Sequence, residues 1–224
     1  MIEILDEILL SDNVVEKFFE NYENDNFKTW LLNILPEVED CKNQQQDNPW
    51  HIYDCLNHIL HSVEHINAQT KNLPNNIRRM LAYVMFYHDI GKPACHIRRF
   101  GKLYGREVDS FFGHNLKSEE IANRTLAVFG FDSREIKIML KLINKHDIFM
   151  FIRMNNDGNS HHRVLNNVLL KEEIDDLNSV GNGKELLHYL IMIGRSDNRS
   201  QNPELTKPSL KMLDCMTEML NNLK

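Results

Sequence analysis

The run IRRMLAYVMFYHDIGKP, at residues 77–93, contains the most apolar helical stretch of the chain. Every residue from 80 to 87 is apolar or aromatic. Such a pattern is typical of a helix that is buried on all sides rather than along one stripe. Asn75 or Asn76 can cap the start of this helix, and Gly91 with the proline that follows ends it. The sequence therefore predicts a central helix in the protein core.

On both sides of this run, apolar residues recur at the spacing of amphipathic helices, and strand-like alternation is rare. The pattern predicts helices over 1–22 (as one or two), 27–35, 53–68, 115–128, 133–145, 164–177, 184–198 and 209–222. Asp132 or Ser133 is expected to cap the helix over 133–145.

Three segments lack this pattern. Residues 41–50 and 155–163 are polar and rich in turn-forming residues, and are predicted to be loops. Residues 96–113 combine three glycines with charged and aromatic residues, and are predicted to form a flap or a small hairpin. We therefore expect an all-α protein, with a helical extension at 1–46 and a helical bundle domain at 47–224.

The composition is that of a globular protein with an acidic balance. The chain has 224 residues, of which 42% are hydrophobic. Lys and Arg number 26 against 32 Asp and Glu, which gives a formal charge of −6. This balance disfavours tight, non-specific binding to long nucleic acid. A local basic strip is nevertheless present, at Lys92, Arg98, Arg99, Lys102 and Arg106.

The cysteines and the N-terminal residues indicate a reducing compartment. The four cysteines lie far apart and form no C-x-x-C pair, which favours free thiols over disulfides or a structural zinc site. Residues 1–20 carry acids within an apolar pattern and lack the basic start of a signal peptide. No run approaches the ~18 apolar residues of a membrane span. A cytoplasmic protein without membrane attachment is expected.

His88 and Asp89 follow directly on the most apolar helix. An imidazole and a carboxylate are costly to bury there unless they are paired or bind a metal. Four other segments carry similar residues: YDCLNH ends at His58, FFGH ends at His114, NKHD contains His146 and GRSD ends at Asp197. Imidazoles and carboxylates without thiolates suit Fe, Mn, Ni, Co, Zn or Mg.

The motif HDIGKP, together with these histidines and the late aspartate, resembles the HD superfamily of metal-dependent phosphohydrolases. The resemblance is closest to the HD domain at the C-terminal side of some bacterial tRNA nucleotidyltransferases. It is carried by LPEVEDCKNQQQDNPWHIYDCLNHILHSVE at 35–64 and by GREVDSFFGHNLKSEEIA at 105–122, and covers roughly residues 33–200. The Gly-Ser and Asp-x-Asp signature of the nucleotidyltransferase domain is missing from the sequence, so nucleotide addition is not implied.

The resemblance implies an HD-domain helical bundle that binds one or two divalent metal ions. The ligands that it implies for the first ion are His58, His88, Asp89 and Asp197. A second ion would be bound by His114 and His146, with Asp89 as the bridge between the two ions.

Three further residues are candidates for contact with a phosphorylated substrate. Lys92 lies three residues after Asp89, where its positive charge can point at a phosphate oxygen. His51 precedes the first ligand helix, at what the resemblance implies is the rim of the pocket. Arg195 lies two residues before Asp197 on one expected helix, and is a candidate either to bind phosphate or only to pair with acids.

The expected activity is hydrolysis of a phosphomonoester or phosphodiester by metal-activated water, with Asp89 and Lys92 as catalytic residues. The expected substrate is a phosphorylated small molecule or nucleotide, or an RNA end. Two alternatives remain open. One is a catalytically silent HD module that binds a nucleotide or RNA. The other is a di-iron oxygenase, because some HD-fold sites carry out oxygen chemistry.

Overall fold

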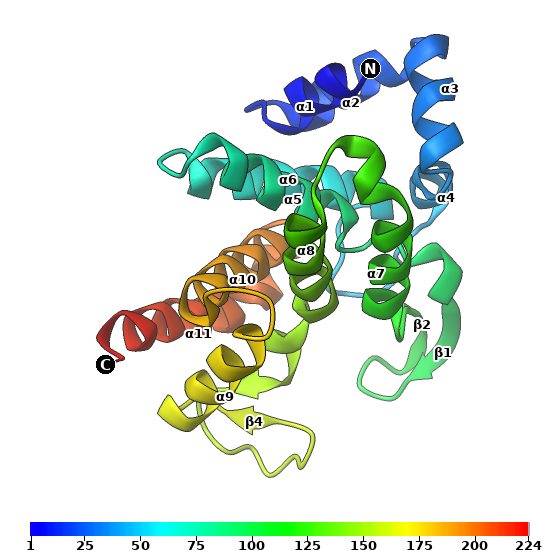
Figure 1. The fold of residues 1–224 in the computed structure, drawn as a ribbon. Coiled ribbons are helices and arrows are strands. Elements are labelled where there is room, and N and C mark those ends of the chain that lie inside the picture. The colour runs from blue at the N-terminus through cyan, green and yellow to red at the C-terminus, as the bar shows by residue number, and fades with distance from the viewer. Residues whose placement is uncertain (224) are drawn as a thin grey trace.

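The computed structural model describes residues 1–223 and confirms the predicted all-α class. Within that range the chain forms eleven α-helices and two small sheets of two strands each (Figure 1). In chain order the helices are α1 (Ile2–Leu9), α2 (Val14–Tyr22), α3 (Asp25–Ile34), α4 (Glu37–Asn43), α5 (Cys55–Thr70), α6 (Asn75–Tyr87), α7 (His114–Thr125), α8 (Ser133–Lys145), α9 (Asn167–Leu177), α10 (Gly183–Arg199) and α11 (Pro203–Asn222).

The α5–α6 pair forms the centre of the bundle. Figure 1 shows α1 and α2 on one side of this pair and α10 on the other, and α1, α2 and α10 all contact it. Helices α7 and α8 pack against each other and contact α6, while α9 and α11 pack against α10. All residues from Met80 to Tyr87 are buried, as the uninterrupted apolar run predicts.

The N-terminal helices share the core of the rest of the protein. Leu5 of α1, Phe18 of α2 and Leu31 of α3 belong to the same apolar cluster as Leu81 of α6. Burial of large apolar side chains is the main favourable contribution to folding. The division of the chain at residue 46 falls in the loop between α4 and α5, and stays a prediction.

Two predicted boundaries were wrong, and both lie in helices that begin at or directly after a proline. Residues 41–43 were expected in a loop, but they form the end of α4, which begins directly after Pro36 and buries Val38 and Cys41. Helix α11 begins at Pro203 and passes through Pro208, where a start at 209 was expected. Pro208 and Glu204 are both exposed, so the carbonyl that loses its hydrogen bond can be solvated.

The capping of α6 also differs from the prediction. Its N-cap is Pro74, without a side-chain hydrogen bond, and Asn75 is the first helical residue. The helix ends at Tyr87, before Gly91 is reached, and His88 is its C-cap. Asp132, by contrast, caps α8 as predicted, in a reciprocal pair with Glu135.

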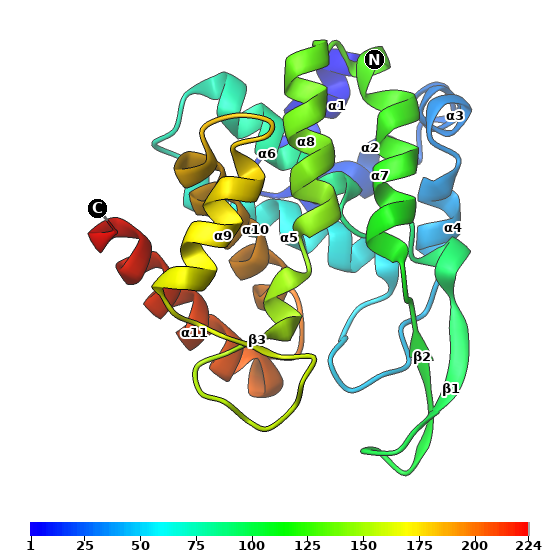
Figure 2. The same cartoon turned by 60° about the horizontal axis from the view of Figure 1, so that its bottom comes forward.

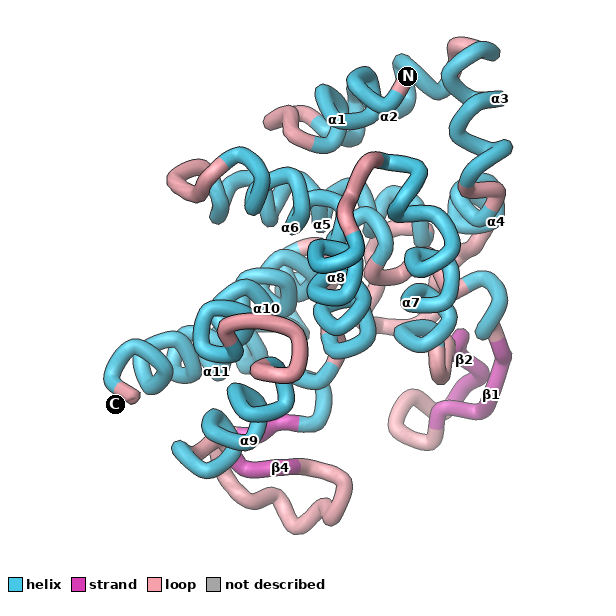
Figure 3. Tube along the Cα trace, in the orientation of Figure 1, coloured by secondary structure: helices cyan, strands magenta, loops and turns pink. Residues whose placement is uncertain are grey.

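The predicted flap is an antiparallel hairpin of β1 (Ile97–Gly101) and β2 (Arg106–Ser110). It extends from the helical body in Figure 2. A second small sheet pairs β3 (Ile152–Arg153) with β4 (Arg163–Val164) around the loop that the sequence predicts, and Figure 3 shows how little of the chain is extended. Within residues 1–223, no helix is long and apolar enough to cross a membrane.

Candidate metal centre

The ends of several helices converge on Asp89. His58 lies in the second turn of α5, and His88 and Asp89 follow the last turn of α6. His114 is the first residue of α7 and His146 is the C-cap of α8. Asp197 lies near the end of α10. Segments far apart in the sequence therefore present imidazoles and carboxylates to one buried point.

Glycines allow α7 to approach this point. A Cβ at Gly91 would lie 2.6 Å from the carbonyl oxygen of His114 and 2.6 Å from the backbone nitrogen of Ser118. Gly91 instead donates its own backbone N–H to the Ser118 hydroxyl at 2.9 Å. Gly113 precedes α7 with a φ of +79°, a conformation that other residues adopt at a cost. These contacts place His114 beside Asp89.

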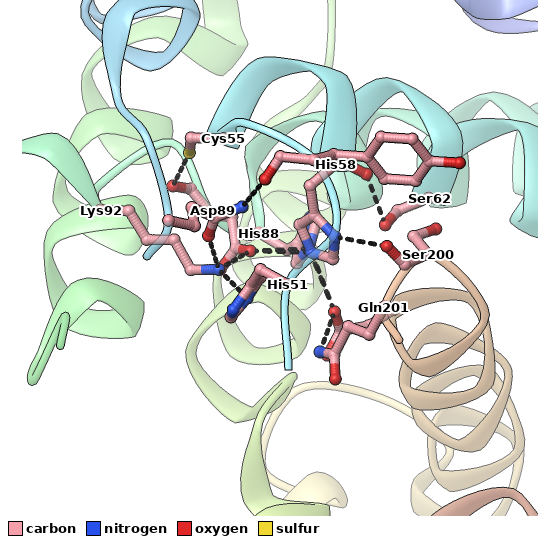
Figure 4. A network of polar contacts seen from close by, with 12 residues as sticks. His51, Cys55, His58, Ser62, His88, Asp89, Lys92, Ser200 and Gln201 are labelled. Carbon is pink, nitrogen blue, oxygen red and sulfur yellow. Dashed lines mark hydrogen bonds and ion pairs between the residues drawn. The ribbon is translucent and has the colours of Figure 1, made fainter. Parts of the chain in front are cut away.

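One group of ligand atoms surrounds one oxygen of Asp89. The Nε2 atom of His58 lies 3.0 Å from Asp89 Oδ2 and 3.0 Å from Asp197 Oδ1. The Nε2 atom of His88 lies 3.3 Å from the same Asp89 oxygen and 3.4 Å from His58 Nε2. Figure 4 shows His58, His88 and Asp89 directed toward one another. These four residues together could hold a metal ion.

A second group surrounds the other oxygen of Asp89. The Nε2 atoms of His114 and His146 lie 3.1 and 3.5 Å from Asp89 Oδ1, and 3.1 Å from each other. Asp89, His114 and His146 could therefore hold an ion as well. Because each group contains a different oxygen of Asp89, this carboxylate is placed to bridge two ions.

Backbone carbonyls hold all four imidazoles in one tautomer. The Nδ1 atom of His58 lies 3.2 Å from the Ser200 carbonyl oxygen, and that of His88 lies 2.6 Å from the Met85 carbonyl oxygen. The Nδ1 atom of His114 lies 2.8 Å from the Phe111 carbonyl oxygen, and that of His146 lies 2.7 Å from the Ile143 carbonyl oxygen. A carbonyl only accepts hydrogen bonds, so each Nδ1 carries a proton and each neutral ring keeps a lone pair on Nε2. These contacts are the outer-shell partners that histidine ligands of metals usually have.

In their neutral form the rings direct their Nε2 lone pairs at one another, and this arrangement needs a proton or a metal ion between them. His58 and His88 approach at 3.4 Å through their Nε2 atoms, and His114 and His146 do so at 3.1 Å. Two neutral acceptors at such distances repel unless a proton or a metal ion lies between them. Nearly complete burial of His58, His88 and His146 leaves little water to relieve that repulsion. The donor set therefore fits a metal ion.

The charge of the site is consistent with this fit. Burial alone would raise the pKa of Asp89, but the Lys92 ammonium and the surrounding histidines outweigh it and hold that pKa well below its usual range. Burial lowers the pKa of His58, but hydrogen bonds to Asp197 and Asp89 outweigh it and raise that pKa to about 9. The carboxylates are thus ionised at neutral pH, and a metal ion would displace a proton from His58.

Lys92 is buried beside Asp89. Its Nζ atom lies 2.6 Å from Asp89 Oδ2, 2.8 Å from Gln46 Oε1 and 3.1 Å from His51 Nε2. Burial and the nearby Lys92 charge hold the pKa of His51 well below its usual range, so its neutral ring accepts a hydrogen bond from the ammonium. The structure therefore places His51 next to Lys92, in accord with its expected position at the pocket rim.

Sequence reasoning missed Gln46. Its side chain is almost fully buried, and it holds Lys92 through Oε1 while its Nε2 donates to the Tyr53 carbonyl. A polar QQQ run gave no signal that one glutamine would be buried. Gln46 and His51 also line a cleft of ≈ 240 Å³ formed by residues 45–47 and 51–54. Both side chains contact the Lys92 ammonium, so the cleft lies next to this residue.

Arg195 does not join the cluster, which corrects its expected role. Its guanidinium lies 2.8 Å from Asp214 and 3.2 Å from Thr217, both on α11, and 3.4 Å from Gln69. Successive helical residues differ by ~100° in direction, so Arg195 points about 200° away from Asp197. The side chain joins α10 to α11, and its proposed contact with substrate has no geometric basis.

The basic strip is partly neutralised. Arg98 and Arg106 both pair with Asp47, at 3.1 and 2.8 Å, and Arg98 also lies 3.2 Å from Asp109. These pairs join the hairpin to the loop that contains Gln46. The arginines therefore support the cleft wall rather than present free charge along the hairpin.

The chain was also compared with known proteins. No protein-family model matches it, and no curated protein matches it significantly. The sequence motifs and the geometry of the cluster are therefore the features that indicate a function.

Proposed function

We propose that this protein is an HD-type, metal-dependent phosphohydrolase that cleaves a phosphomonoester or phosphodiester. The observation that carries this proposal is the pair of ligand groups that share Asp89, one on each carboxylate oxygen. Two ions at a shared carboxylate are typical of enzymes that hydrolyse phosphoesters. The order and spacing of the HD motifs give the same expectation.

The residues of the two groups would hold the ions. His58, His88, Asp89 and Asp197 would hold the first, and Asp89, His114 and His146 the second. Imidazole and carboxylate ligands without thiolate suit Fe, Mn, Ni, Co, Zn or Mg. When bound, such ions supply Lewis-acid activation of water and neutralise charge on a phosphoryl group.

Lys92 would contribute positive charge to the same reaction. Gln46 and His51 accept hydrogen bonds from its ammonium and hold it beside Asp89. Burial lowers the pKa of Lys92, but attraction to Asp89 and Asp197 outweighs it and keeps that pKa above its usual value, so the side chain stays charged. A fixed, water-excluded cation next to the ligand groups stabilises the negative oxygens of a phosphoryl group.

The substrate class rests on the resemblance. A nucleotide or a nucleic-acid end, including an RNA end, is the substrate that we propose. The cleft beside Lys92 is polar, since Gln45, Gln46, Asp47, His51 and Asp54 line it. Such a lining suits a polar ligand better than an apolar one.

The test measures turnover with defined metals. The protein is stripped with a chelator, reloaded separately with Mn, Ni, Co, Fe, Zn or Mg, and assayed with aryl phosphomonoesters, aryl phosphodiesters and 2′,3′-cyclic nucleotides. Asp89→Ala should abolish turnover and metal binding. Asp175→Asn, an exposed change on α9, is the matched control and should leave both unchanged.

Other results would favour the alternatives. An Asp89→Ala variant with full activity would exclude the proposed mechanism. Binding of nucleotides or RNA without turnover, across all the metals, would indicate a silent binding module. Bound iron with a mixed-valence spectrum and no phosphatase activity would indicate a di-iron oxygenase.

A further inference from the structure

A second cleft lies at the opposite end of α5 from His58. Residues Leu10–Asn13, in the turn between α1 and α2, form one wall, together with Lys17 of α2. Lys71, directly after α5, and Arg78 of α6 form the other. In Figure 1 the α1–α2 turn and the α5–α6 turn lie at the same end of the two helix pairs. The cleft measures ≈ 620 Å³, against ≈ 240 Å³ beside Lys92.

The lining of this cleft is positively charged in an acidic protein. Three cations, Lys17, Lys71 and Arg78, face one acid, Asp12. Asp12 pairs with Lys71 at 2.9 Å. Within residues 1–223, neither Lys17 nor Arg78 has a carboxylate oxygen within 4.0 Å. Two cations of the cleft therefore lack the partner that most other basic side chains of this chain have.

Arg78 also has an unsatisfied donor. Its Nε atom is buried from solvent and has no hydrogen-bond acceptor among the described residues. The neighbouring Arg79, in the same helix, has hydrogen-bond acceptors for its guanidinium. Its Nε donates to Asp6 at 2.9 Å, and its NH2 group donates to the Phe129 carbonyl at 2.7 Å. A buried N–H without an acceptor is costly, and no contact within the chain repays that cost at Arg78. Because Arg78 lines the cleft and has no carboxylate partner among the described residues, its guanidinium is left to bind an anion there.

We propose that this cleft binds the phosphate group of a small ligand. The planar guanidinium of Arg78 presents N–H groups in the geometry that phosphate oxygens accept, and Lys17 and Lys71 add positive charge. Helix α2 begins at the cleft, but its first turn already has an acidic partner, because the backbone N–H of Val15 donates to Glu64 Oε1 at 3.1 Å. The attraction for an anion therefore comes from the side-chain cations. The cleft volume matches that of pockets for ligands of nucleotide size.

This site is separate from the metal cluster. Lys71 follows His58 by thirteen residues, which corresponds to ~20 Å along a helix. The ligand would contact the α1–α2 pair and the α5–α6 pair at once. Binding would therefore hold the N-terminal helices against the centre of the bundle, and this inference does not depend on the proposed hydrolase activity.

Thermal unfolding and titration calorimetry test the site with orthophosphate, pyrophosphate and ATP as separate probes, in metal-free buffer with ionic strength held constant by NaCl. At ~100 times its Kd, a ligand should raise Tm by about 5–10 °C. Lys17→Gln together with Arg78→Gln should raise the Kd at least ~10-fold. Arg134→Gln together with Lys137→Gln, two exposed cations of α8, is the control and should bind like the wild type.

Asp89→Asn separates this site from phosphate binding at the metal cluster. We expect Asp89→Asn to keep the Tm shift and the Lys17–Arg78 double variant to lose it. The probe with the lowest Kd distinguishes a free phosphate from a nucleotide. Arg78→Met serves as a milder second variant if the double variant unfolds. The proposal is overturned if none of the three probes shifts the Tm of the wild type at millimolar concentration, or if the shift survives in both Arg78 variants.

Discussion

The two ends of α6 differ in whether their buried polar groups have hydrogen-bond partners. Beyond its C-terminal end, His88 donates to the Met85 carbonyl and Asp89 contacts several partners, so every inward-facing group is held in one orientation. Near its N-terminal end, Arg78 leaves a buried N–H without an acceptor among residues 1–223. The first end holds side chains that could bind a metal ion, while the second leaves a cation without a partner in the chain.

The contrast shows two ways to recognise a site in a structure. A preorganised site is marked by outer-shell hydrogen bonds that fix each ligand, as the carbonyls do for the four histidines. The proposed binding site for an external anion is marked by cations that line a cleft and have no acidic partner among the described residues. The two kinds of site therefore differ in the effect expected when one of their side chains is removed.

The largest effect is expected for Asp89→Ala. Loss of an outer-shell partner typically costs 10–100-fold in activity, so loss of the bridging ligand should cost more than ~100-fold. Metal content should fall for both ions, because each ligand group contains one Asp89 oxygen. Metal analysis together with steady-state kinetics measures this, and retention of two ions by the variant would contradict the bridging role.

Metal removal should lower the stability of the wild type. An ion at ~100 times its Kd contributes about 2.7 kcal/mol, which corresponds to a fall in Tm of about 5–10 °C on chelation. Re-addition of the ion should restore the original Tm, as followed by scanning calorimetry. In Asp89→Ala the chelator should have no effect, and an equal fall there would place the ion elsewhere.

Lys92→Gln should separate charge from metal binding. Glutamine can keep a hydrogen bond to Asp89 but loses the positive charge, so kcat should fall by ~10–100-fold while metal content is retained. The measurement is kcat and KM on the metal-loaded variant. An unchanged kcat would mean that Lys92 only compensates the charge of Asp89.

The neighbouring arginines of α6 should differ in their effect on stability. Arg79→Met breaks charge-assisted hydrogen bonds to Asp6 and to the Phe129 carbonyl, and should cost about 2 kcal/mol in unfolding free energy. Arg78→Met removes a donor that has no acceptor, and should cost less than ~0.5 kcal/mol without phosphate present. Urea unfolding compares the two, and equal losses would show that Arg78 is a structural residue.

The smallest effect is expected for Arg195→Gln. The side chain pairs with an exposed aspartate on α11, and exposed pairs contribute ~0–1 kcal/mol. Activity should stay within about 2-fold of the wild type, because the guanidinium faces α11. A large loss of kcat/KM in this variant would restore the original expectation that Arg195 contacts substrate.

Local patterns predicted most of the helices and loops. The apolar periodicity located the helices, the glycines of 96–113 indicated the hairpin, and the Asp132 cap of α8 was read from one residue. The errors at α4, α6 and α11 all involve prolines at or near a helix start. Whether a proline ends, begins or is tolerated in a helix depends on what surrounds it, which local patterns do not contain.

The predicted ligands met in space because their motifs lie at helix ends that the fold brings together. The side chains around them were not predictable in the same way. Gln46 lies in a run of three glutamines, and nothing in that run indicates which of them contacts Lys92. Ser200 contacts His58 only through its backbone carbonyl, which every residue type has, so the sequence does not indicate this contact. Arg195 has the positive charge expected of a phosphate ligand and lies close to Asp197 in the sequence. The direction of its side chain, however, depends on how α10 is rotated about its axis.

By itself, the amino-acid sequence determined the helical class, the central buried helix and the set of imidazoles and carboxylates available for a metal, because periodicity and residue chemistry are local properties. The tertiary structure decided that the two oxygens of Asp89 serve different ligand groups, that Arg195 faces α11 and that Arg78 lacks an acceptor. These outcomes depend on where helices distant in sequence cross, and on which atoms are left over once they have packed.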